Sequence, residues 1–253
     1  MNLKYLKNIQ YIIKMAYIFS IEGNIAAGKT TLLKKLKETN NLKGYPILFI
    51  EEPVEVWETI KDNEGKNILQ HFYDDNVKYA FPFQMMAYIS KIQLLVKTIK
   101  DNPKSIIILD RSIFTDKNIF VEMLHDSGKL NDIEYNIYLK WFDAYKEGVK
   151  LDGIIYLKTN VEYSMQRIIT RGRPGEKNIP KEYLQSCYNY HEIWLNNLDE
   201  QENILLLNGN RDLNDDYENH ILAVHAFMQN FIDDDDKHQT NELMKIIMDH
   251  PFM

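Results

Sequence analysis

Residues 23–31, Gly-Asn-Ile-Ala-Ala-Gly-Lys-Thr-Thr, fit the phosphate-binding pattern of a glycine, any four residues, Gly-Lys and then Ser or Thr. Gly23 and Gly28 let the backbone turn tightly and direct its N–H groups at phosphate oxygens. Lys29 is placed to reach the β- and γ-phosphates of a nucleotide, and the Thr30 hydroxyl to bind Mg²⁺. A glycine turn that merely begins a helix is the plainer alternative. Further contacts to the nucleotide are expected from Asn24, Ala26, Ala27 and Thr31.

Two charged groups follow apolar runs elsewhere in the chain. Glu52 follows residues 47–50, and Asp110 and Arg111 follow residues 106–109. If these runs are strands of an open parallel sheet, their carboxyl ends form the edge at which ligands bind. Glu52 is then suited to accept the proton of an attacking hydroxyl, Asp110 to hold magnesium, and Arg111 to orient the acceptor or to pair with Glu52. A solvated loop carboxylate and a strand-end ion pair are the structural alternatives.

A cluster of arginines follows the fourth apolar run. Arg167 and Arg171 are four residues apart and share one helix face, and Arg173 precedes the Pro-Gly-Glu stretch at 174–176. Cations at a helix C-terminus also complement the helix dipole, which is the structural interpretation. We favour a mobile lid that closes guanidinium groups over a triphosphate, because phosphoryl transfer depends on cationic stabilisation.

Five near-continuous apolar runs are typical of strands covered on both faces: residues 17–22, 47–50, 106–109, 154–157 and 204–207. Helical periodicity separates them, at residues 30–37, 83–100, 133–146, 182–198 and 215–232. The alternation predicts an α/β fold with a five-stranded parallel sheet between two helix layers, a three-layer α/β/α arrangement. It also gives the glycine loop the strand before it and the helix after it that a nucleotide site requires. We therefore predict that the chain binds ATP or another nucleoside triphosphate.

The chain divides into three predicted parts. Residues 1–16 form an N-terminal extension, residues 17–232 one catalytic domain, and residues 233–253 a solvated acidic tail with a C-terminal segment. The extension carries three lysines and no acidic residue, so organelle targeting is an alternative to a loosely docked terminus.

Composition excludes several classes of function. The net charge of −7, from 37 acidic and 30 basic residues, disfavours nucleic acid as a partner. No apolar run approaches the length of a membrane span, and no Cys/His cluster has zinc-like spacing. The single cysteine, Cys187, excludes an internal disulfide. We predict a cytoplasmic enzyme with no membrane and no nucleic-acid partner.

Together these motifs resemble the deoxynucleoside kinases, a family that includes deoxycytidine, deoxyguanosine and mitochondrial thymidine kinases and the insect multisubstrate enzyme. The resemblance covers residues 17 to about 213 and implies a P-loop kinase-type fold with an arginine-bearing lid. It is carried by residues 23–30, Glu52-Pro53-Val54 with Trp57, Phe83-Gln84, Asp110-Arg111-Ser112, and Arg171-Gly172-Arg173 with Glu176.

The resemblance implies roles for individual residues. Glu52 is similar to the family's general base toward the sugar 5′-hydroxyl, with Arg111 beside it. The nucleoside is implied to lie between Trp57 and Phe83, with Gln84 reading the edge of its base, since an amide offers both acceptor and donor hydrogens. Further implied contacts are Tyr73 and Glu176 to the sugar 3′-hydroxyl, and the segment containing Asp212 to the adenine of ATP. The family also implies a homodimer formed through long helices.

Two departures from the family pattern affect the expected substrate and metal. Asp110 stands where the family more often has Glu, which shortens the reach to Mg²⁺ by one methylene. Lys91 stands where the deoxycytidine and deoxyguanosine kinases have an arginine, and Asp116 matches the aspartate that partners it. The charge pair favours deoxycytidine or a deoxypurine over thymidine, although lysine lacks the planar fork of arginine.

We therefore expect ATP-dependent phosphorylation of a deoxynucleoside at its 5′-hydroxyl, giving the monophosphate in nucleotide salvage. A nucleoside monophosphate kinase of thymidylate type shares the loop, the sheet and the lid, but needs further cations for the acceptor's phosphate. A non-catalytic NTP-binding switch module is the alternative from a different class, and it predicts no transfer to a small acceptor.

Overall fold

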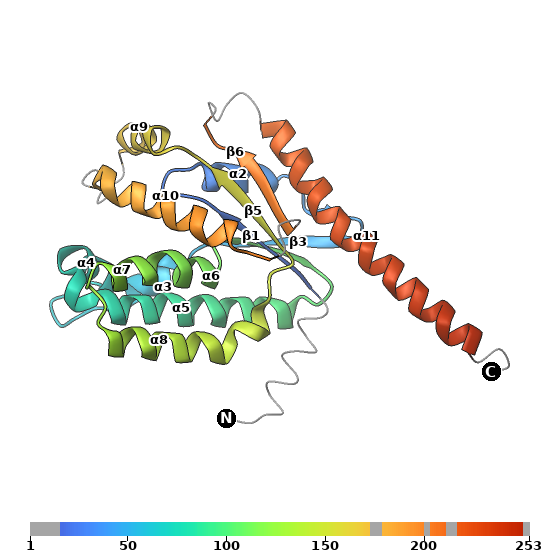
Figure 1. The fold of residues 1–253 in the computed structure, drawn as a ribbon, viewed down its shortest axis with the longest axis horizontal. Helices are drawn as coiled ribbons and strands as arrows, with labels where there is room; N and C mark the ends of the chain where they lie inside the picture. Colours follow the sequence, from blue (N-terminus) through green and yellow to red (C-terminus); the bar gives the residue numbers. More distant parts are fainter. Residues whose placement is uncertain (1–15, 173–178, 200–202, 211–216, 250–253) are drawn as a thin grey trace.

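The structure is a computed structural model that describes residues 16–172, 179–199, 203–210 and 217–249, with the backbone alone at 147 and over 234–249. A sheet of parallel strands forms its centre (Figure 1): β1 (Tyr17–Glu22), β3 (Tyr45–Ile50), β4 (Ile106–Asp110), β5 (Gly153–Lys158) and β6 (Ile204–Asn208). A two-residue strand, β2 (Asn41–Leu42), pairs antiparallel with β3, and the sheet has the order β2-β3-β4-β1-β5-β6. The parallel sheet of five strands is confirmed, and β2 adds a sixth strand at its edge.

The strand order puts the predicted site residues at one edge. The chain runs from β1 to one side of the sheet, through β3 and β4, and then crosses to β5 and β6 on the other. The register pairs Ile21 with Asp110 and Ile50 with Leu109, so β1, β3 and β4 end at the same level. The segments that follow these three strands therefore emerge side by side, at the kind of edge where open α/β sheets bind ligands.

Helices cover both faces of the sheet (Figure 1). Successive residues of β1 point to opposite faces: Ile18 joins a core under α5 (Asn76–Asp101) and α8 (Asp132–Tyr145), whereas Phe19 joins a core under α2 (Lys29–Leu36) and α11 (Tyr217–Asp249). The other helical segments are α3 (Val54–Thr59), α4 (Ile68–Asp74), α6 (Ile113–Thr115), the π-helical Asp116–Val121, α7 (Glu122–Asp126), the 3₁₀ turn Lys146–Val149, α9 (Val161–Arg171) and α10 (Lys181–Asn196). The three-layer arrangement is confirmed.

Two helices extend beyond the bounds expected from the sequence. The helix expected at 83–100 begins at Asn76, because the Asp75 side chain caps it by accepting from the N–H of Lys78, and Pro82 lies inside it. The helix expected to end at 232 continues as α11 through the acidic run to Asp249, so the backbone of the expected tail is helical (Figure 1). Of the expected extension, residues 1–15 lie outside the described residues. None of the described helices is long and apolar enough to cross a membrane.

Candidate active site

The loop between β1 and α2 has the backbone shape that its glycines predict. Gly23 has φ +149°, and a Cβ there would lie 2.7 Å from the carbonyl oxygen of Leu157 on β5, so only glycine fits. Ala26 and Gly28 also have positive φ, at 57° and 110°. These left-handed residues curl the backbone tightly at the N-terminus of α2, which is the geometry of an anion-binding loop.

Side chains of the protein hold the carbonyl oxygens of this loop. Lys29 is only 6% exposed, and its ammonium donates to Gly23 O at 3.0 Å and to Asn24 O at 2.9 Å. Arg167 donates to Ala27 O at 2.8 Å, and the Thr159 hydroxyl donates to the same oxygen at 3.1 Å. Engaging the carbonyls in this way suits a loop that turns its N–H groups toward an anion.

Several charged side chains lie close to Lys29. Burial, reinforced by the nearby Arg111, lowers the pKa of Lys29 to about 8, although Asp110, Glu52 and Glu22 oppose the shift. The interactions show that the lysine of the loop and the charged residues after β3 and β4 occupy one site. Lys29 is therefore protonated at neutral pH and is poised to gain a phosphate partner.

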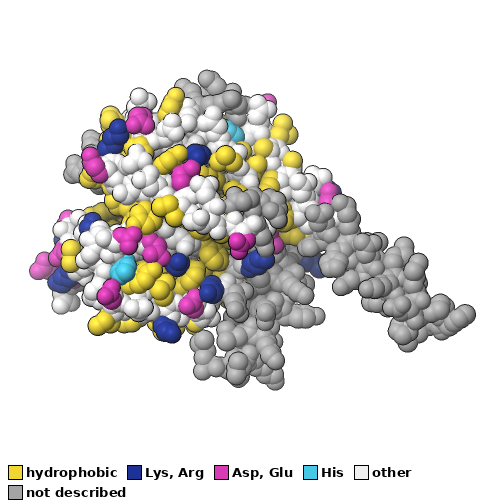
Figure 2. Space-filling view, in the orientation of Figure 1, with side chains coloured by type: hydrophobic (Ala, Val, Ile, Leu, Met, Phe, Trp, Pro, Cys, Tyr) yellow, Lys and Arg dark blue, Asp and Glu magenta, His cyan; other side chains and the backbone are white. Residues whose placement is uncertain are grey.

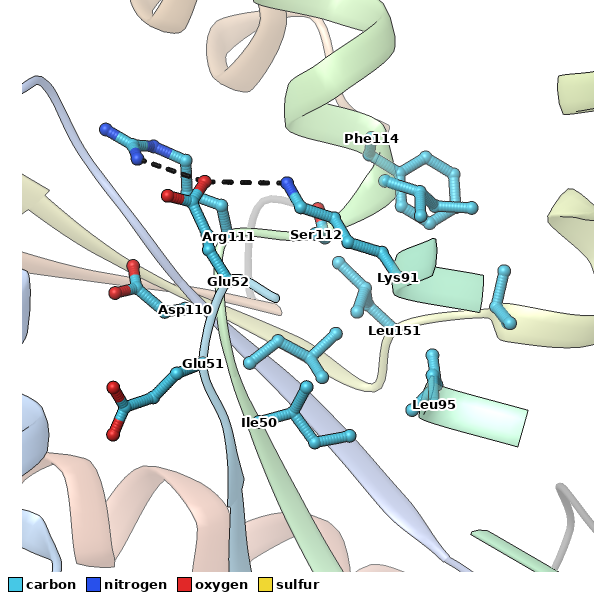
Figure 3. A pocket seen from close by; sticks show the side chains of 13 residues that line it. Ile50, Glu51, Glu52, Lys91, Leu95, Asp110, Arg111, Ser112, Phe114 and Leu151 are labelled. Carbon is cyan, nitrogen blue, oxygen red and sulfur yellow. Dashed lines mark hydrogen bonds and ion pairs between the residues drawn. The ribbon is translucent and has the colours of Figure 1, made fainter. Parts of the chain in front are cut away.

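Glu52 follows β3 and faces two cations (Figure 3). Its Oε1 lies 3.3 Å from Nη1 of Arg111 and 3.6 Å from Nζ of Lys91. Burial opposes ionisation, but Arg111, Lys91 and Lys29 together hold the pKa of Glu52 below its usual value of 4.5. A small hollow adjoins these groups, with an apolar wall that includes Ile50, Leu95 and Leu151. Glu52 is thus a carboxylate at neutral pH, as a general base requires.

Arg111 connects Glu52 to the phosphate loop. While Nη1 donates to Glu52, Nη2 lies 3.5 Å from the carbonyl oxygen of Gly23. The guanidinium also lies over the ring of Phe120, with Cζ 5.6 Å from its centroid. Its backbone has φ +60°, which is uncommon for a residue with a side chain and marks a turn held in place by its surroundings.

The aromatic residues expected around a nucleoside lie together. Trp57 and Phe83 meet edge to face with centroids 5.4 Å apart, and Phe83 stacks on Phe72 at 4.6 Å. The Trp57 indole donates to the Ser90 hydroxyl at 2.9 Å, which fixes the ring. Gln84 comes next to Phe83 on α5 and is 4% exposed.

The charge pair expected at the base edge is present. Lys91, two turns after Gln84 on α5, lies with Nζ 2.7 Å from Oδ1 of Asp116. Burial opposes the ammonium form, but Asp116 and Glu52 together raise the pKa of Lys91 above its usual value. The second oxygen of Asp116, Oδ2, is buried and has no partner among the described residues. Because Nζ of Lys91 also lies 3.6 Å from Oε1 of Glu52, the pair lies next to the expected general base.

A family model described as deoxynucleoside kinase matches residues 19–233, most of the chain. The chain belongs to the deoxynucleoside kinase family. It is 38% identical over 203 residues to a probable deoxycytidine kinase of fowlpox virus, covering 78% of this chain and 80% of the relative. It is 34% identical over 237 residues to human deoxycytidine kinase, covering 83% and 90%. A mitochondrial deoxyguanosine kinase of Xenopus laevis is 30% identical over 230 residues, covering 81% and 84%.

Membership of the deoxynucleoside kinases confirms the resemblance, the P-loop kinase fold and enzymatic activity as a kinase. Membership of this kinase family implies a nucleotide phosphate donor and a nucleoside substrate. The sheet order, with β1 between β4 and β5, is the framework that brings the loop at 23–31 and Glu52 together.

The kinase has two residues that suit Mg²⁺. Oδ1 of Asp110 is buried without a hydrogen-bond partner among the described residues, and Thr30 is the second residue of α2. No group of three or more His, Cys, Asp or Glu in the described part of the chain is arranged to hold a metal. Mg²⁺ is usually held by one or two protein groups together with phosphates and waters, so Asp110 and Thr30 fit this ion.

For several predicted site residues of the kinase, the structure shows only part of the expected contacts or none of them. Arg171 is the last residue of α9, which ends at Gly172 with φ +60°. Arg167 donates to carbonyl groups of the loop and, at 2.7 Å, to Gly209 O, so it links α9 to the segment after β6. Tyr73 is 62% exposed on α4. The predictions for Arg173, Glu176 and Asp212 fall outside the described residues, and the lid stays a prediction.

One side of the site was missed from the sequence. Tyr183 on α10 is partly buried, which raises its pKa, and the Cys187 thiol, Tyr73 and Arg111 lie near enough to influence it. Burial raises the pKa of Cys187 to about 12, so this thiol is unreactive at neutral pH. A tyrosine at this position carries no motif of its own, and only the packing of α10 beside the loop brings it to the site. The contact of Asn24 with Leu184 O, at 2.9 Å, makes that packing specific.

Proposed function

We propose that this kinase transfers the γ-phosphoryl group of ATP, or of another nucleoside triphosphate, to the 5′-hydroxyl of a deoxynucleoside. The product is the deoxynucleoside monophosphate, which places the enzyme in nucleotide salvage. The observation that carries the proposal is the double contact of Arg111 with Glu52 and with Gly23 O. Through it one guanidinium contacts both the carboxylate proposed to serve the acceptor hydroxyl and the loop proposed to hold the donor phosphates.

The proposed step follows from this arrangement. Glu52 accepts the proton of the 5′-hydroxyl while that oxygen forms a bond to the γ-phosphorus. The bond from the γ-phosphorus to the bridging oxygen breaks, and a nucleoside diphosphate leaves. Lys29 and the loop N–H groups stabilise the charge on the phosphates, and Arg111 keeps Glu52 oriented. When bound, Mg²⁺ on Asp110 and Thr30 would neutralise charge on the donor phosphates.

The base preference follows from the donors and acceptors that line the expected pocket. Asp116 Oδ2, buried without a partner in the described part of the chain, suits the exocyclic amine of cytosine or adenine. Thymine has a carbonyl oxygen and a methyl group on that edge in place of an amine. Gln84 supplies one acceptor and two donor hydrogens beside this pair. We therefore propose deoxycytidine or a deoxypurine as acceptor. Asp116 Oδ2 supports cytosine and adenine, whereas guanine, which carries a carbonyl oxygen at C6, is included because one relative is named a deoxyguanosine kinase.

We also propose that the kinase is a homodimer. Ile133, Ile137 and Trp141 repeat at intervals of four along α8 and are 74%, 41% and 46% exposed, so they form an apolar stripe on one helix face. A second copy packing against α8 would bury this stripe. Sedimentation velocity should give a dimer for the natural chain and a monomer for Trp141→Arg, and a natural chain that sediments as a monomer would contradict the proposal.

The proposed partners are small molecules and a second copy, with no nucleic acid and no membrane, in the cytoplasm. On the face shown in Figure 2, acidic and basic side chains of the described residues are interspersed, and the net charge is −7. Such a surface is unsuited to binding the phosphate backbone of a nucleic acid.

The decisive experiment offers the enzyme ATP and Mg²⁺ with each of the four deoxynucleosides and, separately, with their four monophosphates. We expect ADP release and a monophosphate product with deoxycytidine or a deoxypurine. Transfer to monophosphates alone would support the thymidylate-type kinase instead. No transfer to any acceptor, together with nucleotide-dependent binding of a protein partner, would support the switch module.

A further inference from the structure

Glu22, the last residue of β1, is a fully buried carboxylate that belongs to no motif identified above. Its Oε1 accepts a hydrogen bond from the Ser112 N–H at 3.0 Å and another from the Ser112 hydroxyl at 2.8 Å. Its Oε2 accepts a hydrogen bond from the Thr115 hydroxyl. A buried carboxylate with three hydrogen bonds is strongly held, and here all three come from the segment directly after Arg111.

These contacts fix the backbone on both sides of the Arg111 side chain. The Arg111 N–H donates to Ile21 O at 3.2 Å, and the next N–H, that of Ser112, donates to Glu22. Between these two anchors Arg111 has φ +60°, a conformation that is uncommon for residues with a side chain. The end of β1 therefore holds the left-handed turn that aims the guanidinium at Glu52 and Gly23 O.

We propose that Glu22 is a positioning residue for phosphoryl transfer, which acts through Ser112 and Thr115 to hold Arg111 against Glu52 and the phosphate loop. The proposal rests on the proposed function, because it needs Arg111 to act in the transfer step. Glu22 directly precedes Gly23, so the same residue ties the strand that begins the phosphate loop to the turn that carries Arg111.

The simpler interpretation is that Glu22 only caps a helix. Ser112 is the N-cap residue of α6, and its hydroxyl donates to Glu22 instead of accepting from the helix. A cap that serves the helix alone contributes to folding stability and leaves turnover per folded molecule unchanged. A positioning residue lowers kcat even in fully folded protein, and does so only while Arg111 is present.

The test begins with Glu22→Gln, which keeps the size of the side chain and removes its charge and one acceptor. We expect kcat to fall by about tenfold to a hundredfold, as small misplacements of catalytic groups do. The KM values for ATP and the deoxynucleoside should stay within about threefold, because the loop and the pocket are retained. An unchanged kcat in Glu22→Gln, or a raised KM for ATP with kcat retained, would overturn the proposal.

A double-mutant cycle with Arg111→Ala separates positioning from general loss of structure. If Glu22 acts through Arg111, adding Glu22→Gln to Arg111→Ala should lower kcat by less than about twofold more. Losses that multiply would overturn the proposal, because Glu22 would then act independently of Arg111. Arg111→Ala with full kcat would instead refute the role of Arg111 in the proposed function, so the two failures are distinguishable.

Two further variants guard against misfolding. Thr115→Val removes one donor to Glu22 and keeps the packing, and it should give a smaller loss of kcat in the same direction. Ser105→Ala removes a buried hydroxyl that donates to Asn102 O at 2.8 Å, immediately before β4 and away from the site. This control should keep kcat. If Ser105→Ala lowered kcat as much as Thr115→Val, loss of any buried hydrogen bond would explain the effect and the proposal would fail.

Discussion

Arg111 and Glu52 follow neighbouring parallel strands, and Nη1 of the guanidinium lies 3.3 Å from Oε1 of the carboxylate. The other terminal nitrogen of the guanidinium lies 3.5 Å from the carbonyl oxygen of Gly23. One side chain thus spans the expected acceptor side and donor side of the site. Changes at this contact should therefore affect turnover more than folding, because its atoms lie where the proposed transfer takes place.

Replacing the carboxylate of Glu52 tests its role as general base. Glu52→Gln should lower kcat by about 10²–10⁴-fold, the usual contribution of a positioned base. Steady-state kinetics with a deoxynucleoside acceptor measures the loss. Glu51→Gln is the matched control, because Glu51 is the neighbouring residue, is exposed and pairs with Lys37 away from Arg111. Equal losses in the two variants, or a normal kcat in Glu52→Gln, would contradict the assignment.

The cations around Glu52 predict the acidic limb of the pH profile. Because Arg111, Lys91 and Lys29 outweigh burial and lower the pKa of Glu52, kcat/KM should hold from neutral pH downward and fall only below pH 4.5. Folding stability should depend on pH in the same direction as kcat/KM. Ionised Glu52 stabilises the fold above this range, and that contribution is lost as the pH falls through the lowered pKa.

Removing Lys91 should shift the acidic limb of the kcat/KM profile to higher pH. The double variant Lys91→Met, Asp116→Asn takes away one cation near Glu52 without leaving the Asp116 carboxylate buried and unpaired. The pKa of Glu52 should rise, so kcat/KM should begin to fall at a higher pH than in the natural chain. Profiles recorded alongside circular dichroism at each pH separate this shift from unfolding. A limb that stays in place or moves to lower pH would refute the electrostatic account.

Much of the site could be predicted from the sequence. The glycine pattern predicts the loop, and the rule that parallel strands end at one edge predicts that Glu52 and Arg111 meet. The pairing of Lys91 with Asp116 came from family spacing, and the structure confirms it at 2.7 Å. These predictions hold because each depends on a residue's place in a motif or at a strand end, which the linear sequence records.

Other features depend on packing that the sequence does not record. In the sequence Glu22 is recognisable only as the last residue of a strand. In the structure its three hydrogen bonds come from residues 90 and 93 positions away. Pro82 indicates a helix boundary by its missing N–H, yet α5 begins about two turns earlier, at the Asp75 cap. The acidic run after Ile232 contains no Gly or Pro, so nothing in it obliges α11 to end.

Lys29 should decide whether ATP binds at all. Lys29→Met removes the ammonium expected to reach the donor phosphates, and ATP affinity measured by calorimetry without acceptor should fall by at least about a hundredfold. Lys34→Met is the matched control, because Lys34 lies one helical turn later on α2 and is exposed. Retained ATP affinity in Lys29→Met would refute the assignment of the loop.

Substitutions of Arg171 and Arg173 should have a different effect from substitution of Arg167. Arg171→Ala and Arg173→Ala should slow turnover by about 10³–10⁵-fold, at least as severely as Glu52→Gln, because cations over the triphosphate act in the transition state. Arg167→Ala should instead raise the KM for ATP and lower the melting temperature, since Arg167 joins Ala27 O to Gly209 O. Rapid-quench measurement of the transfer step, together with thermal melts, distinguishes the two patterns. Near-normal transfer in Arg171→Ala and Arg173→Ala beside an inactive Glu52→Gln would show that the lid assignment is wrong.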